Sequence, residues 1–267
     1  MDSGAEIVLD FSPYFRAYKD GHVEKFFGRD VVPPGTDRVT GVSSKDVQIF
    51  PETGVSARVF VPTTISPGEK LPLLVYFHGG GFVVGSPFCS VYHNFVTSLV
   101  KEAEVVVVSV DYRLAPEYPV PIAYEDSWAA SHASGSGPEP ILNEHADLSR
   151  VFLSGDSAGG NIVHNMVAQA GEESLGEKVT LLGSCLIHPH FIKREGDDSE
   201  KIWRLACPTT SGSGDPRMNP ISDARLARIG CGRVLICLAE IDWLRDEGLF
   251  YYETLVKSGW GWRGGDF

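Results

Sequence analysis

Continuous apolar runs alternate with segments of helical spacing along most of this chain, and that alternation limits the fold more than any other feature. The runs LPLLVYF and AEVVVVSVDY have the β-branched and aromatic content of strands covered on both faces. Further strands are expected in RVFLS, KVTLLGSCLIHP and CGRVLICLAE, with helices in PFCSVYHNFVTSLVKE, AGGNIVHNMVAQAG and DEGLFYYETLVKSG. Strands and helices in this order predict a doubly wound, mostly parallel α/β sheet.

The remaining segments suggest how the chain is organised around that sheet. SKDVQIF and VSARVFVP predict two strands around the turn PETG. Residues 1–40 are expected to be irregular because VVPPG breaks any helix. Residues 191–216 interrupt the rhythm and are interpreted as an insertion over the strand ends. At 267 residues the chain is predicted to form a single domain, 1–267.

Charge and cysteine content exclude several classes of function. With 23 basic and 35 acidic residues the net charge is -12, which argues against nucleic acid or an anionic membrane as partner. The N-terminus lacks the pattern of a secretory signal, and no apolar run reaches the roughly 20 residues that span a bilayer. Five scattered cysteines indicate free thiols and a cytoplasmic location. His188 and His190 lack further ligands at suitable spacing, so no metal site is predicted.

The stretch VFLSGDSAGG places Ser157 in a Gly-x-Ser-x-Gly turn between an expected strand and an expected helix. Such a turn lifts the serine hydroxyl off the sheet, and its glycines allow close approach of neighbouring backbone. A second glycine-rich stretch, HGGGF, follows the strand that ends at Phe77. Its peptide N–H groups at Gly80 and Gly81 are candidates, with that of Ala158, for binding an oxyanion. A phosphate-binding loop is the rival interpretation, but no Gly-Lys-Ser/Thr follows.

At this point the sequence resembles a known family. HGGGF, VDYRLAPEYPVPIAYEDSWAA and GDSAGGN resemble the hormone-sensitive-lipase group of α/β hydrolases. DFSPYFRAYKDGHVEKF and LRDEGLFYYETLVKSGW are similar to its plant carboxylesterase branch, which includes gibberellin receptors and 2-hydroxyisoflavanone dehydratases. The likeness extends from about Ile7 to Trp260. It implies an α/β-hydrolase fold with an N-terminal cap over the site, and hydrolysis of small carboxylic esters without a cofactor.

The family's functional residues are carried over where this sequence matches its motifs. Ser157 matches the nucleophile, and Asp242 in AEIDWLRD matches the acid of the triad, with Asp246 as a nearby competitor. Asp156, beside the serine, is expected to support the residues of the site and not to serve as the acid of the triad. The oxyanion donors are matched by Gly80, Gly81 and Ala158, within the loop that begins at His78 and Gly79.

The family's catalytic histidine has no match. In this fold the triad order is serine, acid, histidine, yet all eight histidines precede Asp242. The sequence is therefore expected to lack the last strand and helix, and its tail GWRGGDF suggests a shifted or truncated reading frame. Loss of one triad member typically lowers turnover by ~10⁴–10⁶. Neither His188 nor His190 is expected to substitute, so the chain is predicted to be weak or inactive.

Three functions compete on the sequence alone. The first is a carboxylesterase that acts on small acyl or aryl esters through an acyl-enzyme at Ser157. The second is a binding protein similar to gibberellin receptors, although these carry a serine at the third glycine of HGGGF, where this chain has Gly81. The third is a dehydratase of the isoflavanone type, which uses the same pocket.

Overall fold

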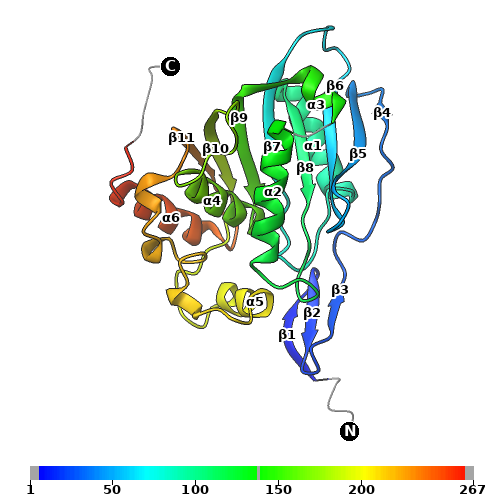
Figure 1. The fold of residues 1–267 in the computed structure, drawn as a ribbon. Coiled ribbons are helices and arrows are strands. Elements are labelled where there is room, and N and C mark those ends of the chain that lie inside the picture. Colours follow the sequence, from blue (N-terminus) through cyan, green and yellow to red (C-terminus); the bar gives the residue numbers. More distant parts are fainter. Residues whose placement is uncertain (1–5, 137–138, 262–267) are drawn as a thin grey trace.

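The computed structural model describes residues 6–136 and 139–261. Its main feature is an eight-stranded sheet with the strand order β11-β10-β9-β7-β8-β6-β5-β4 (Figure 1). The strands from β11 to β8 are parallel to one another, and β6, β5 and β4 continue the sheet as antiparallel neighbours. The predicted mostly parallel sheet is thus confirmed. The bounds are β4 (Thr36–Asp37), β5 (Val42–Phe50), β6 (Val55–Pro62), β7 (Leu71–Phe77), β8 (Val106–Asp111), β9 (Ala146–Asp156), β10 (Leu181–Ile187) and β11 (Arg233–Cys237).

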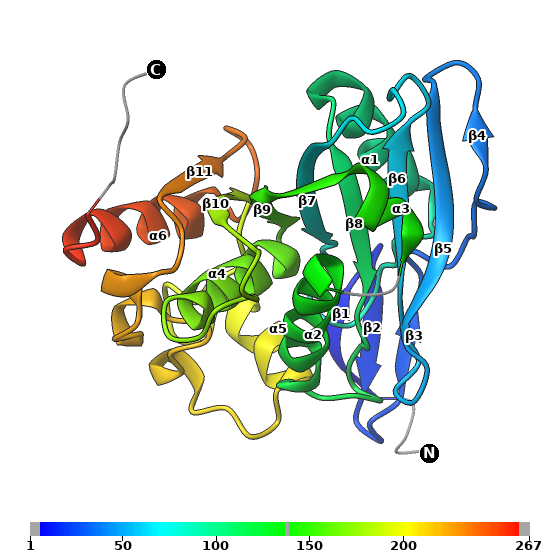
Figure 2. The same ribbon diagram turned by 45° about the horizontal axis from the view of Figure 1, so that its top comes forward.

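Helices cover both faces of this sheet. In both views α2 and α4 lie on one face and α1 lies on the other (Figures 1 and 2). The longer helices are α1 (Ser90–Ala103), α2 (Ile122–Ser136), α4 (Ala158–Ala170), α5 (Asp198–Ala206) and α6 (Arg245–Lys257). Shorter turns of helix are α3 (Pro140–His145), η2 (Gly212–Gly214), η3 (Pro220–Ser222) and η4 (Leu226–Arg228).

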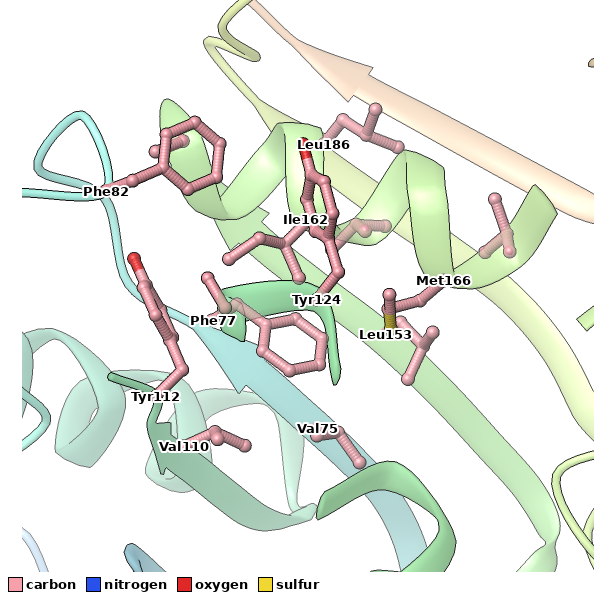
Figure 3. Close-up of a cluster of buried hydrophobic side chains, with 14 of the residues drawn as sticks. Val75, Phe77, Phe82, Val110, Tyr112, Tyr124, Leu153, Ile162, Met166 and Leu186 are labelled. Atoms are coloured by element: carbon pink, nitrogen blue, oxygen red, sulfur yellow. The ribbon is translucent and has the colours of Figure 1, made fainter. Parts of the chain in front are cut away.

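The side-chain alternation of β7 shows why the central strands need cover on both faces. Val75 and Phe77 pack with Ile162 and Met166 of α4 in the larger core (Figure 3). Tyr76, between them in sequence, points into a second cluster with α1. Successive side chains of a strand point to opposite faces. An uninterrupted apolar run such as LPLLVYF is therefore stable only as a strand between two layers of helices.

Two smaller elements lie at the end of the sheet where β7, β9 and β10 terminate (Figures 1 and 2). One is an antiparallel sheet of β1 (Ile7–Phe11), β2 (Phe15–Tyr18) and β3 (Val23–Lys25). The expectation of irregular structure before residue 40 is therefore wrong. The other is α5, within the predicted insertion 191–216. The prediction that the final strand and helix are lacking stays a prediction, and residues 262–267 of the tail lie outside the described residues.

Candidate active site

Ser157 stands at the turn between β9 and α4, in a backbone conformation that side chains rarely adopt. Its φ is 51° and its ψ is -116°. A non-glycine residue held at positive φ stores strain that the surrounding structure must impose. Here the Ser157 N–H donates to the carbonyl of Ile187 at 2.9 Å, and the Ser157 carbonyl accepts from the N–H of His190 at 3.0 Å. The segment from the end of β10 to His190 therefore fixes the serine backbone.

The glycines beside Ser157 allow the end of β7 to approach the start of α4. A Cβ added at Gly159 would collide with the carbonyl oxygen of Phe77 and would lie 2.8 Å from that of His78. A Cβ added at Gly155 would lie 2.5 Å from the Gly159 carbonyl. Both contacts are shorter than real Cβ atoms tolerate, so the two glycines are required by packing. The turn predicted from Gly-x-Ser-x-Gly is present at this place.

The HGGGF stretch forms a tight loop beside Ser157. Gly80 and Gly81 have φ values of 112° and 63°, which favour glycine. The Gly80 carbonyl accepts the N–H groups of Val83 and Val84, both at 3.0 Å. Gly80, Gly81 and Ser157 line one cavity. Ala158 begins α4, and the N–H groups of a first helical turn have no partner within the helix.

His78 is buried and holds the start of this loop. Its Nδ1 lies 2.7 Å from the carbonyl oxygen of Gly79, and its own carbonyl accepts the Tyr112 hydroxyl at 2.7 Å. Burial lowers the pKa of His78 to about 4, although the bond to Gly79 opposes that shift. The ring is therefore neutral at neutral pH, with Nδ1–H donating to Gly79. His78 supports the loop. Within the described part of the chain, it forms no hydrogen bond with Ser157.

Asp242 follows β11 and lines the same cavity as Ser157. Its carboxylate accepts the N–H of Leu244 at 2.8 Å, which fixes its orientation. The competitor Asp246 lies in the first turn of α6, 3.7 Å from the ammonium of Lys193. It lines a neighbouring cavity of about 410 Å³, which Asp242 also lines, but not the one at Ser157. The geometry thus favours Asp242 over Asp246 as the acid.

The cavity at Ser157 has a volume of about 370 Å³ and is bounded by elements far apart in the sequence. The N-terminal sheet contributes Phe11, and α5 contributes Ile202. Trp243 lies edge-on to Phe11, with ring centroids 5.5 Å apart. Sequence reasoning missed most of these residues. The aromatic side chains of the wall are Phe11, Tyr14, Phe27, Tyr76, Tyr92, Phe95 and Trp243.

Two histidines, His188 and His190, also line this cavity. The Nδ1 atom of His188 accepts the N–H of Ala239, 3.2 Å away. His190 is buried, with Nε2 3.3 Å from the carbonyl of Ser199, and burial lowers its pKa to about 4. Within residues 6–136 and 139–261, no hydrogen bond joins a histidine to the Ser157 hydroxyl.

His164, further along α4, also bonds to groups other than Ser157. Its ring is buried, with Nδ1 3.3 Å from the Tyr251 hydroxyl and Nε2 3.2 Å from the Asp223 carboxylate. Both ring nitrogens are thus engaged on the side of α4 that meets α6. Hydrogen bonds from His164 and Arg225 outweigh burial and lower the pKa of Asp223. This cluster stabilises packing and has no bond to Ser157.

The described part of the chain contains no group of three or more histidine, cysteine or carboxylate side chains arranged to hold a metal ion. Among its helices, none has the length and apolarity needed to cross a membrane.

A family model described as alpha/beta hydrolase fold matches residues 74–261. The chain belongs to this family. The match includes the HGGGF loop, the turn at Ser157 and Asp242, whereas Phe11, Tyr14 and Phe27 of the cavity wall precede it. The α/β-hydrolase fold expected from the resemblance is confirmed, whereas the role of the N-terminal segment as a cap stays a prediction.

Individual relatives are named as carboxylesterases, as esterases or as tuliposide A-converting enzymes. The chain is 44% identical to "Probable carboxylesterase 2" of Arabidopsis thaliana, over 96% of this chain and 85% of that protein. It is 42% identical to "Tuliposide A-converting enzyme 2, chloroplastic" of Tulipa gesneriana, over 96% and 69%. Among solved structures, a hyperthermophilic esterase from Pyrobaculum calidifontis has a TM-score of 0.66 at 30% identity, covering 85% of this chain and 74% of that one. The predicted relationship to plant carboxylesterases is confirmed.

Proposed function

We propose that this α/β hydrolase is a carboxylesterase in which Ser157 attacks the ester carbonyl. The observation that carries the proposal is the strained backbone of Ser157, whose side chain lines one cavity with Gly80 and Gly81. Strain of this kind is retained where it positions a reacting group. The names of the relatives, a probable carboxylesterase and an esterase, agree with this reaction class.

Each residue then has a distinct role. The Ser157 oxygen gives up its proton and bonds to the carbonyl carbon, the bond between that carbon and the alkoxy oxygen breaks, and the alkoxy group leaves as the alcohol after taking up a proton. Water then cleaves the acyl-enzyme to the carboxylic acid and the free serine. Negative charge develops on the former carbonyl oxygen, where the N–H groups of Gly80, Gly81 and Ala158 would stabilise it. Asp242 is the carboxylate that would orient an imidazole between itself and the serine. The reaction needs no metal or organic cofactor.

The cavity wall favours a neutral substrate with an apolar or aromatic group. Phe11, Tyr14, Phe27 and Trp243 form much of the wall, and no lysine or arginine is among the described residues that line it. An anionic acyl group would therefore lose its hydration without gaining a cationic partner. Aryl esters and short acyl esters fit this apolar wall. Molecules of that size also fit the cavity volume of about 370 Å³.

We further propose that proton transfer limits the rate of this chain. The two histidines of the cavity, His188 and His190, bond to backbone groups at Ala239 and Ser199. Without a general base at Ser157 the turnover is expected to be weak. The same observation favours a second function, the binding of an apolar small molecule without turnover.

The cytoplasm is the proposed location because all five cysteines are free.

One experiment separates these functions. The wild-type protein, Ser157→Ala and the control Ser174→Ala, an exposed serine on a loop, are incubated with a fluorophosphonate probe and with p-nitrophenyl acetate. Labelling and turnover that persist in the control and vanish in Ser157→Ala support the esterase. Nanomolar affinity for an apolar ligand without either signal would support the binding protein. Turnover that survives in Ser157→Ala would refute the proposed nucleophile.

A further inference from the structure

The side chain next to the nucleophile connects three elements of the site. The carboxylate of Asp156 accepts the Tyr76 hydroxyl at 2.7 Å and the Gly79 N–H at 2.9 Å, both on Oδ1. Its Oδ2 accepts the Tyr92 hydroxyl at 2.9 Å. Tyr76 lies on β7, Gly79 in the HGGGF loop and Tyr92 on α1, whereas Asp156 ends β9.

The Gly79 N–H is held from two sides. It donates to Asp156 and also to the Tyr92 oxygen, 2.8 Å away. This N–H is therefore committed to the cluster, and the next two N–H groups of the loop, those of Gly80 and Gly81, stay available at the cavity. A Cβ added at Gly79 would collide with the Asp156 carboxylate. Glycine at position 79 is thus required by the close approach of that carboxylate.

The contacts bear on function because of the covalent order of the chain. Asp156 precedes Ser157 directly, and Gly79 precedes Gly80 directly. A hydrogen bond between Asp156 and Gly79 therefore joins the backbone of the nucleophile to the backbone of the oxyanion donors. The hydroxyls of Tyr76 and Tyr92 fix the carboxylate rotamer on which that connection depends. Both tyrosines are buried, so little water competes for these bonds.

We propose that Asp156, Tyr76 and Tyr92 are positioning residues that set the distance between Ser157 and the N–H groups of Gly80 and Gly81. The proposal rests on the esterase function of Ser157 and adds a requirement to it. Oxyanion stabilisation needs donors about 2.7–3.1 Å from the developing charge. A displacement of about 1 Å can cost about a hundredfold in rate.

Removing one hydroxyl tests this without removing a ring from the cavity wall. Tyr92→Phe is expected to lower kcat about tenfold to a hundredfold and to leave KM within about twofold, because ground-state binding depends on the ring. Tyr76→Phe is expected to act in the same direction. The matched control is Tyr251→Phe, which removes the hydroxyl of a fully buried tyrosine that contacts His164 on α4.

The measurements are kcat and KM for p-nitrophenyl butyrate, the dissociation constant of phenylboronic acid, which forms a tetrahedral adduct with serine, and the midpoint of thermal unfolding. For Tyr92→Phe the dissociation constant is expected to rise by about the factor by which kcat falls. Tyr251→Phe is expected to lower the thermal midpoint only. If Tyr92→Phe and Tyr76→Phe also change only the thermal midpoint, the cluster supports the fold and the proposal is overturned. If Ser157→Ala leaves turnover and boronate binding intact, the esterase function itself fails, which is a different result.

Discussion

Replacing Glu247 with glutamine should make the stability of the protein less dependent on pH. Glu247 is buried in the first turn of α6, where its carboxylate accepts the N–H of Phe191 at 2.9 Å and the Ser199 hydroxyl. Burial raises its pKa from 4.5 to about 8, although the two hydrogen bonds oppose that shift. A glutamine has the same shape, and its amide oxygen and NH₂ group can bond to Phe191 and Ser199.

The sign follows from proton linkage. Between pH 4.5 and about 8 the folded state keeps the Glu247 proton that the unfolded state has lost. The contribution of Glu247 to the free energy of unfolding therefore falls as pH rises, and it levels off above about pH 8. Each increase of one pH unit within that window lowers the free energy of unfolding by about 1.4 kcal/mol. Integrated from pH 5 to pH 9 with the two pKa values, wild type should lose about 4 kcal/mol relative to Glu247→Gln.

Urea unfolding of both proteins at five pH values between 5 and 9 measures this difference. Other groups titrate in the same range, but they are common to both proteins and cancel in the difference. The slope m should be equal in the two proteins, because the surface exposed on unfolding is unchanged. A difference that stays constant from pH 5 to pH 9 would refute the reasoning, since Glu247 would then ionise in the folded state as it does in water.

Three further predictions concern the site. Exogenous imidazole should increase Ser157-dependent turnover of p-nitrophenyl butyrate at least tenfold, because it can take up the Ser157 proton, a role for which neither His188 nor His190 is placed. If imidazole gives no larger increase in the wild type than in Ser157→Ala, the proposed limit on proton transfer is contradicted. Gly159→Ala should lower the free energy of unfolding measured in urea by about 3 kcal/mol, because the added methyl group overlaps the Phe77 carbonyl. The control Gly35→Ala should leave it unchanged, because a methyl group there has no atom within 4 Å. Trp243→Ala should raise KM for p-nitrophenyl benzoate about three- to tenfold and KM for the acetate less; equal effects on both esters would argue against an aromatic wall.

The large sheet could be predicted from the sequence because each central strand carries its own signal. Apart from the Tyr76 hydroxyl, the run Leu71–Phe77 is apolar throughout, which is typical of a strand covered on both faces. The N-terminal sheet carries no comparable signal. Its strands have five, four and three residues, with Pro13 and Gly21 between them. Contacts such as that between Phe11 and Trp243 stabilise it, and these join residues far apart in the sequence.

The parts of the site also differ in whether a local sequence pattern marks them. Ser157 and the HGGGF loop could be located because a strained turn and a loop at positive φ require particular residue types at consecutive positions. Tyr76 and Tyr92 could not, since 80 and 64 residues separate them from Asp156 and no local spacing marks either contact. The pKa of Glu247 likewise follows from burial that only the folded chain creates.

The candidate site divides into two parts that depend on different regions of the fold. The proposed nucleophile Ser157 follows β9 and the proposed oxyanion loop follows β7, both in the middle of the sheet, where close backbone contacts and the Asp156 cluster fix them. Asp242 lies instead on the loop after β11, between Ile241 and Trp243, which are 97% and 51% exposed. Changes around that loop can therefore alter proton transfer while the serine and its N–H donors keep their geometry. Binding of tetrahedral adducts should for this reason be less sensitive than turnover to substitutions near Asp242.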